Sequence, residues 1–236
     1  MDTLIIEKKN EVYITVDCDP NIQREISEFF TFYVPGYKFM PAFRNRMWDG
    51  KIRLYSQKTK EIYFGLFPYI RAFAEERGYH IVAGKDVEIN NSVDKEIVKK
   101  FSNSLGQKFE ARDYQIDAIY HSLKFNRALL LSPTASGKSF IIYSLIRYYS
   151  HLVKDTPNNR ILLIVPTTSL VEQMYSDFQS YGWNVKKNCH RLYSGYSNQT
   201  DKKVLISTWQ SLYKLPKKYF EQFGVVFGDE AHLFKS

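Results

Sequence analysis

Residues 132–139 read Ser-Pro-Thr-Ala-Ser-Gly-Lys-Ser, and this stretch decides the fold class of the chain. The residues just before it, 127–131, form a short apolar run that is typical of a buried parallel strand. Residues 140–149 place apolar side chains at helical spacing. A loop between a buried strand and a helix presents backbone N–H groups at the positive end of the helix dipole, where anions bind. The stretch therefore predicts a phosphate-binding loop.

Two side chains of this loop have a chemistry that suits a nucleotide. Lys138 is expected to reach the outer phosphates, and the Ser139 hydroxyl is expected to bind Mg²⁺. The usual pattern has Gly at the position of Ser132, so the match rests on Gly-Lys-Ser in the right context. An ordinary turn between a strand and a helix is the alternative.

Composition indicates a folded protein with one large or two small domains. The chain has 236 residues, of which 44% are hydrophobic and 16% aromatic. No apolar run has membrane-spanning length, and the N-terminus has no signal-peptide pattern. Cys18 and Cys189 are far apart and lack metal-ligand spacing. These features favour a reducing cytoplasm, that of the host cell if the protein is viral.

Positive charge is concentrated in one short region. The net charge of +8 suggests a polyanionic partner. Residues 36–60 hold seven Lys and Arg residues against the single acid Asp49, whereas the rest of the first half is slightly acidic. This clustering, more than the total charge, points to a nucleic-acid contact.

The first part of the chain predicts a small α+β domain over residues 1–84. A hairpin is expected over 4–16 with its turn at Lys9-Asn10, followed by a helix that starts at Asp19-Pro20 and runs to about residue 33. Three further elements are expected: a second hairpin over 51–64, a helix over 68–77 that Gly78 ends, and a strand over 80–83. Residues 85–108 are polar and predict a linker with one short helix.

From residue 112 onward, helices and buried strands alternate. The predicted helices cover residues 112–123, 138–153, 169–181 and 210–214. The predicted strands cover residues 127–131, 160–165, 189–193, 204–208 and 225–229. This alternation is typical of α/β folds, and it predicts a doubly wound parallel sheet.

The last predicted strand ends in two carboxylates, Asp229 and Glu230. The carboxyl end of a strand is where α/β sheets place their ligand chemistry. Asp229 suits Mg²⁺, directly or through water, and Glu230 suits the positioning or deprotonation of an attacking water. His232 could transmit the nucleotide state. A solvated strand end would be the better interpretation if the phosphate-binding loop were absent.

Five short sequences occur in a fixed order. They are Arg112-Asp113-Tyr114-Gln115, residues 132–139, Val-Pro-Thr-Thr-Ser-Leu-Val-Glu-Gln at 165–173, Ser-Thr-Trp-Gln-Ser-Leu at 207–212, and Asp229-Glu230-Ala231-His232. In this order they resemble the motifs in the first motor domain of the superfamily 2 DEAH-type helicases. The resemblance implies a RecA-like domain over residues 109–236 that uses ATP and Mg²⁺.

The resemblance also implies a role for each matching position. Gln115, with Arg112 beside it, is expected to read the adenine base, since a side-chain amide both donates and accepts. The triphosphate is expected to bind Thr134, Ala135, Ser136, Gly137, Lys138 and Ser139. The nucleic-acid backbone is expected to contact Pro166, Thr167, Thr168, Ser207 and Thr208. Outside this context, a surface glutamine and ordinary helix caps would explain these residues better.

Two departures from the helicase pattern stand out. Ala135 occupies a position where these helicases commonly have Gly, which is tolerable if its φ need not be positive. The chain also ends at Ser236, shortly after the Asp-Glu-Ala-His sequence. Motif III, a strand inserted between the phosphate-loop and DEAH strands, and the second motor domain with its arginine finger would lie beyond it. We therefore expect a piece of a longer protein, truncated after motif II and inactive alone.

Residues 36–53 interleave cations with aromatic side chains. Lys38, Arg44, Arg46, Lys51 and Arg53 are expected to meet phosphates, and Trp48 is expected to stack on an unpaired base or to wedge at a junction. The alternative is that the aromatic residues form the core of a small domain.

Together these features predict an ATP-dependent DNA helicase or translocase that remodels branched or recombining DNA. We expect a monomer that binds DNA without regard to sequence, does not engage membranes, and works with its own second motor domain. Two other functions stay open: a DNA-binding module with a silent nucleotide site, and an RNA helicase.

Overall fold

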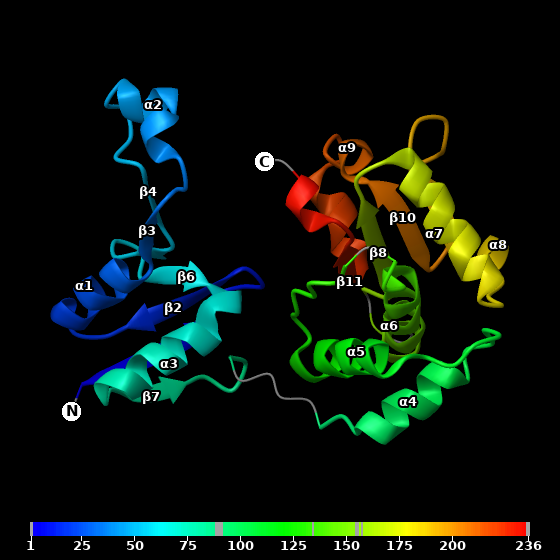
Figure 1. Ribbon diagram of the computed structural model, residues 1–236, viewed down its shortest axis with the longest axis horizontal. Coiled ribbons are helices and arrows are strands. Elements are labelled where there is room, and N and C mark those ends of the chain that lie inside the picture. The colour runs from blue at the N-terminus through cyan, green and yellow to red at the C-terminus, as the bar shows by residue number, and fades with distance from the viewer. Residues whose placement is uncertain (1, 88–91, 134, 154–155, 157, 235–236) are drawn as a thin grey trace. The chain divides into compact units, whose positions relative to one another are not determined.

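The computed structural model describes residues 2–87, 92–133, 135–153, 156 and 158–234. The chain forms two compact units, Met1–Asn90 and Asn91–Ser236 (Figure 1). Among the described helices, none is both long and apolar enough to cross a membrane. Each unit has a hydrophobic core of its own.

The first unit is built on a five-stranded sheet with the order β5-β6-β2-β1-β7. Its strands are β1 Thr3–Lys8, β2 Tyr13–Asp17, β5 Tyr55–Ser56, β6 Glu61–Tyr63 and β7 His80–Ala83. Only β1 and β7 pair in parallel. Alternate residues such as Ile6 and Ile14 are fully buried beneath helices α1 Pro20–Phe29 and α3 Phe67–Arg77. The first predicted hairpin, the second helix and the closing strand are thus confirmed.

The helix predicted to reach residue 33 is shorter than expected. Helix α1 starts as predicted, with the Asp19 carboxylate accepting from the backbone N–H of Asn21. It ends at Phe29, and Thr31–Tyr33 forms strand β3, which pairs antiparallel with β4 Lys51–Arg53. Thr31, Phe32 and Tyr33 are β-branched or aromatic and favour a strand once a partner is present.

The second hairpin is confirmed only in part. Residues 51–56 were expected to form one strand, but the chain divides it into β4 and β5 on either side of Leu54. Only β5 pairs with β6, because β4 is taken by β3.

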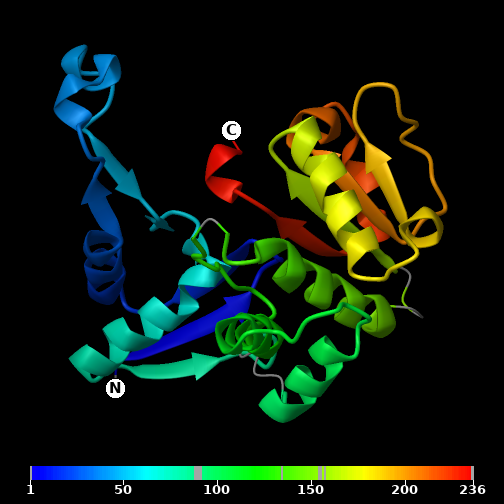
Figure 2. The same ribbon diagram turned by 45° about the vertical axis from the view of Figure 1, so that its right-hand side comes forward.

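The β3–β4 ribbon projects from the sheet and its helices in both views (Figures 1 and 2). Its end carries the short 3₁₀ helix η1 Tyr37–Phe39 and helix α2 Pro41–Arg44. We call residues 31–53 the arm. A hydrogen bond of 2.9 Å from the Val34 N–H to the Gly50 carbonyl closes the ribbon below the tip. No described residue of the arm belongs to the hydrophobic core of the first unit.

The second unit is built on a parallel sheet with the order β11-β8-β10-β9. Its strands are β8 Arg160–Val165, β9 Cys189–Leu192, β10 Val204–Thr208 and β11 Phe223–Gly228. Its helices are α4 Lys95–Asn103, α5 Asp113–Phe125, α6 Lys138–Leu152, α7 Thr168–Ser180, α8 Val185–Asn188 and α9 Trp209–Leu212, with the 3₁₀ helices η3 Lys217–Gln222 and η4 Ala231–Leu233. The predicted α/β class with a parallel sheet is confirmed.

Both faces of this sheet are covered, which explains its continuous apolar strands. Ile161 and Leu163 of β8 belong to the core with residues of α5, α6 and α7. Leu162, on the opposite face, packs in a separate cluster with Leu212 of α9. Helices α6 and α7 contact the sheet directly. The carboxyl ends of β8, β10 and β11 lie at one edge, because Thr208 pairs with Val165 and Gly228 with Ile164.

The prediction of a strand at residues 127–131 is wrong. In the described chain this stretch forms no strand, and Leu129 and Leu131 are 80% and 91% exposed. A strand forms only where a neighbouring strand can share its backbone hydrogen bonds. None of the four strands of the sheet pairs with this stretch.

The region predicted as a linker contributes to the second unit. Helix α4 starts at the Asp94 cap, and Val98 and Leu105 are buried in the same core as α5 and α6. The Gln107 amide donates to the Ser102 carbonyl at 2.8 Å, which fixes the turn after the helix.

Candidate nucleotide site and nucleic-acid contacts

Gly137 is the cap of helix α6 and has a φ of +77°. A Cβ atom at this position would lie 2.4 Å from Nε2 of Gln115. Gly137 is therefore required twice, for its left-handed backbone and for the space that the Gln115 amide occupies. Lys138 follows as the first residue of the helix. Thr134, expected to contact the triphosphate, lies outside the described residues.

Ala135 also has a positive φ, of +63°. Alanine was expected to be tolerated at this position if its φ need not be positive, and that condition is not met. A residue with a Cβ in this conformation costs about 1–2 kcal/mol. The loop carries this strain at a position where the helicases that the sequence resembles commonly have glycine.

Gln115 and Tyr114 hold the loop from helix α5. Gln115 is 5% exposed, its Oε1 accepts from the Arg112 N–H at 3.0 Å, and its Nε2 donates to the Ser136 carbonyl at 3.1 Å. The Tyr114 hydroxyl donates to the same carbonyl at 2.9 Å and accepts from the Arg112 guanidinium at 3.1 Å. The Gln115 amide, the predicted adenine reader, is thus engaged with the phosphate-binding loop itself. Nothing in the sequence pattern indicated this role for Tyr114.

The Lys138 ammonium pairs with the Glu230 carboxylate, 92 positions away in the chain. The two sequence motifs therefore meet in space. The ion pair raises the pKa of Lys138 and lowers the pKa of Glu230. Both groups are thus held charged at neutral pH. Glu230 itself has a φ of +50°, and its second carboxylate oxygen lies 3.5 Å from Nδ1 of the exposed His232.

Asp229 is buried at the end of β11, with 7% of its surface exposed. Its N–H donates to the Ile164 carbonyl at 2.9 Å, which continues the ladder to β8. Burial raises the pKa of this carboxyl, and the nearby Lys138 ammonium opposes the shift. A buried carboxylate that lacks full charge compensation is suited to a cation.

The Ser139 and Tyr181 hydroxyls lie 2.8 Å apart, at hydrogen-bond distance. Asp177 of α7 lies near this group: burial raises the pKa of its carboxyl, and the nearby Ser139 hydroxyl partly opposes the shift. Tyr181 and Asp177 are therefore polar neighbours of the predicted magnesium ligand. Neither residue was predicted from the sequence, because both follow the third motif at a spacing with no known signature.

The residues of the second unit that were predicted to contact the nucleic-acid backbone differ in how exposed they are. Thr167 is exposed and caps α7 by accepting from the Leu170 N–H at 3.3 Å, and Thr168 begins that helix. The Pro166 carbonyl accepts from the Gln210 amide at 3.4 Å. Ser207, in contrast, is fully buried and donates to the Leu192 carbonyl at 2.9 Å. Thr208 is buried too, 3.0 Å from the Ser211 hydroxyl, so neither hydroxyl reaches the surface.

The cations predicted to meet phosphates are all on the arm. Arg53 pairs with Asp49, and the Lys51 ammonium lies 4.9 Å from the Tyr33 ring centre. Lys38, Arg44 and Arg46 are exposed. Trp48 is half-buried and lies outside the core, so the structure does not support its alternative assignment as a core residue.

Residues 108–236 match the protein family described as type III restriction enzyme, res subunit. The chain belongs to this family. Residues 5–84 match a second family, described as the N-terminal part of the DNA helicase UvsW. The UvsW match lies within the first unit and the res-subunit match lies within the second, while residues 85–107 belong to neither match.

Individual relatives agree with these family matches. The chain is 35% identical over 232 residues to the ATP-dependent DNA helicase UvsW of Enterobacteria phage T4, covering 94% of this chain and 45% of that protein. A crystal structure of the UvsW helicase from bacteriophage T4 superposes with a TM-score of 0.83 at 31% identity, covering 100% of this chain and 84% of that one. A second UvsW structure has a TM-score of 0.83 at 32% identity, covering 98% of this chain and 48% of that one. The resemblance to helicases is confirmed, and the chain spans about half the length of the curated relative.

The loop of this res-subunit domain fits a nucleotide with Mg²⁺. Gly137 is the left-handed cap of a 15-residue helix, and Lys138 supplies an ammonium at the first position of that helix. Ser139 and Asp229 supply the oxygen ligands that Mg²⁺ prefers. In the described part of the chain no three His, Cys, Asp or Glu side chains are grouped for a metal. A Mg²⁺ held by one carboxylate, one hydroxyl and substrate phosphates needs no such group.

Proposed function

We propose that this chain is the DNA-recognition domain and first motor domain of an ATP-dependent helicase or translocase that remodels branched or recombining DNA. The proposed division is a DNA-recognition domain over 1–84, a connecting segment over 85–108 whose helix α4 packs on the core of the second unit, and a motor domain over 109–236. The meeting of Lys138 with Glu230, 92 positions apart, carries the proposal. This pairing brings together the two sequences whose order indicated a nucleotide-driven motor.

Each residue of the site has a proposed role. Lys138 and the loop N–H groups bind the outer phosphates, and Ser139 and Asp229 hold Mg²⁺. When bound, the metal neutralises charge on the phosphates. Glu230 orients the water that attacks, which requires Lys138 to release its carboxylate first. Gln115, with Arg112 beside it, is proposed to read adenine, and this requires its amide to exchange the Ser136 carbonyl for the base.

The nucleic-acid partner is proposed to be DNA, bound without regard to sequence. The arm cations and the loops at Pro166, Thr167 and Thr168 would contact the backbone. The buried Ser207 and Thr208 would act through the backbone of their loop. We propose a cytoplasmic monomer that acts with a second motor domain of its own protein, so that this chain alone shows little DNA-stimulated ATP hydrolysis.

The test is nucleotide binding by the 236-residue chain, followed by ATP hydrolysis in a protein that includes a second motor domain. A fluorescent ATP analogue should bind in the presence of Mg²⁺, and Lys138→Ala should weaken this binding. Lys124→Ala, on helix α5, is the matched control. Absence of Mg²⁺-dependent binding by the wild type would show that the nucleotide site is silent. Matched DNA and RNA forks then decide which polymer stimulates hydrolysis.

A further inference from the structure

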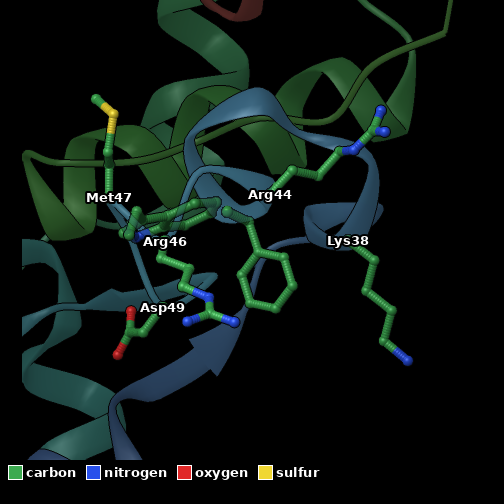
Figure 3. Close-up of a pocket in the computed structure, with 7 residues that line it drawn as sticks. Lys38, Arg44, Arg46, Met47 and Asp49 are labelled. Atoms are coloured by element: carbon green, nitrogen blue, oxygen red, sulfur yellow. The ribbon is translucent and has the colours of Figure 1, made fainter.

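The tip of the arm contains a pocket of about 620 Å³ (Figure 3). This size lies in the range of small-molecule sites. Its apolar lining comes from Phe43, Met47 and Trp48, and its polar lining includes Lys38, Arg44 and Arg46. We call it the tip pocket. The combination of aromatic walls and a cationic rim distinguishes it from an apolar groove.

The aromatic walls are fixed by contacts below them. The Trp48 indole N–H donates to the Lys51 carbonyl at 2.9 Å, which sets the orientation of the ring. Phe43 packs edge-on against Tyr37, with ring centres 4.8 Å apart, and Tyr37 stacks on Tyr33 at 4.7 Å. A rigid aromatic wall loses little entropy when a flat ligand stacks on it.

The cations of the rim have no protein partner for their charge. Within the described chain, the side chains of Arg44 and Arg46 form no hydrogen bond or ion pair, and Lys38 lies only near the Tyr37 ring, at 5.9 Å. The acid of the pocket, Asp49, is already paired with Arg53. Figure 3 shows Lys38 and Arg44 extending outward, while Arg46 and Asp49 lie on one side of the pocket. The tip pocket therefore carries an excess of positive charge.

Arg46 is held in a conformation that favours glycine. Helix α2 ends in a Schellman motif, in which the Arg46 N–H donates to the Phe43 carbonyl at 3.0 Å and the Met47 N–H to the Ala42 carbonyl at 2.9 Å. This motif usually has glycine where Arg46 stands, with a φ of +57°. The fold tolerates the cost of an arginine here, and a strained residue at a pocket is a sign of function.

We propose that the tip pocket binds one unpaired nucleotide of a DNA strand. The base stacks on the aromatic wall that Trp48 provides, and the phosphates on either side of it meet Arg44 and Arg46. Every base has a face that can stack, so this recognition needs no particular sequence. An unpaired base is selected because removing a paired base from a duplex costs free energy. This inference rests on the proposed function, because it assumes that the arm contacts DNA.

The experiment uses the 236-residue chain and two hairpin DNAs, each closed by a non-nucleotide linker in place of a loop of unpaired bases. One is fully paired, and the other carries a single unpaired 2-aminopurine nucleotide, a fluorescent adenine analogue. We expect the unpaired nucleotide to tighten binding by about 5- to 150-fold, the range of one stacked base. The fluorescence of 2-aminopurine should fall as the base stacks. Trp48→Ala should abolish both effects.

Two further variants separate binding from folding. Arg46→Gly places glycine, the preferred residue, in the Schellman motif, so this variant should melt at the same temperature as the wild type or higher. It should still bind the unpaired nucleotide more weakly than the wild type does. Met47→Ala removes a side chain that is 79% exposed, so it tests the pocket without disturbing the core. Arg24→Ala, at an exposed cation on helix α1 outside the arm and outside the cluster at residues 36–60, should change nothing.

The outcomes distinguish this inference from the proposed function. Equal affinity for the two hairpins, with unchanged fluorescence, overturns the tip pocket as a nucleotide site and leaves DNA binding intact. Loss of affinity for both hairpins together with a lower melting temperature in Trp48→Ala shows that Trp48 is structural, and also overturns it. If the wild type binds neither hairpin, the proposed function fails as well.

Discussion

Lys138 and Glu230 form an ion pair that joins the phosphate-binding loop to the end of strand β11. The same ammonium is the group expected to meet the outer phosphates of a nucleotide. A bound triphosphate would therefore compete with Glu230 for Lys138. Release of the carboxylate on binding would make Glu230 available only when substrate is present.

Glu230→Gln should bind the ATP analogue about two- to fivefold more tightly than the wild type, because the phosphates no longer compete with a partly exposed ion pair. In a protein that includes a second motor domain, the same change should abolish ATP turnover. Lys138→Ala should weaken nucleotide binding by about 10- to 150-fold, the scale of a charged hydrogen bond. Titration with the fluorescent analogue measures both. Turnover by Glu230→Gln near the wild-type rate would refute its role with the water.

Ala135→Gly should stabilise the second unit by about 0.5–1 kcal/mol. The φ of +63° costs alanine about 1–2 kcal/mol, and glycine removes this cost. Glycine also gives the unfolded chain more conformational freedom, which offsets part of the stabilisation. Gly137→Ala should do the opposite, because its Cβ would meet the Gln115 amide at 2.4 Å. Denaturant melts of both variants check the pair. A loss of stability in Ala135→Gly would contradict the strain at this position.

Asp229→Asn should raise the melting temperature at neutral pH. Burial raises the pKa of Asp229, so the folded state binds this proton more tightly than the unfolded chain does. The ionised carboxylate therefore costs stability at neutral pH, and the amide removes that cost. The gain should shrink as the pH falls through the raised pKa, because the wild-type carboxyl then becomes neutral. Asp201→Asn, at a side chain that is 88% exposed, is the control and should show no such pH-dependent gain.

Replacing Arg44 and Arg46 by Ala together should flatten the slope of log affinity against log salt for duplex DNA by about two, one for each phosphate that an arginine no longer neutralises. Binding should weaken alike on paired and branched DNA. Arg24→Ala, at an exposed cation outside this cluster, should leave the slope unchanged. An unchanged slope in the double variant would mean that the arm cations do not meet phosphates.

Gly50→Ala should disable the arm without unfolding its domain. Gly50 has a φ of +79°, and a Cβ would lie 2.3 Å from the Tyr37 ring that supports Phe43. DNA affinity should fall as in the double arginine variant, while the main melting transition stays in place. A large drop in melting temperature would show that the arm contributes to global stability.

The parts of the fold that follow from local pattern were predictable. Strands β8 and β10 match their predicted ranges, because burial on both faces requires an unbroken apolar run. The end of α1 was not predictable, because β3 exists only through its pairing with β4, some twenty positions away. The run at 127–131 has the composition of a buried strand, but no strand among the described residues pairs with it, and composition cannot show that.

The residues of the candidate site likewise fall into those that the sequence could predict and those that it could not. The motif residues Lys138, Asp229 and Glu230 were identified in advance, and Lys138 and Glu230 do meet. The supporting residues Tyr114, Tyr181 and Asp177 were not identified, since their roles depend on the distance between helices. The positive φ of Ala135 likewise depends on how the loop closes, which no short sequence pattern encodes. The roles of the site residues stay predictions until they are measured.

The arm supplies no described residue to the hydrophobic core of its unit, and this separation has an evolutionary consequence. Selection for a folded domain bears mainly on the sheet and its two helices, and it bears on the tip through local contacts such as the close approach of Gly50 to Tyr37. Substitutions at the tip can therefore accumulate, or be selected for a new DNA structure, while the scaffold remains intact. Exchange of residues 34–50 between relatives should transfer substrate preference from one protein to another, which makes the arm a natural unit for engineering.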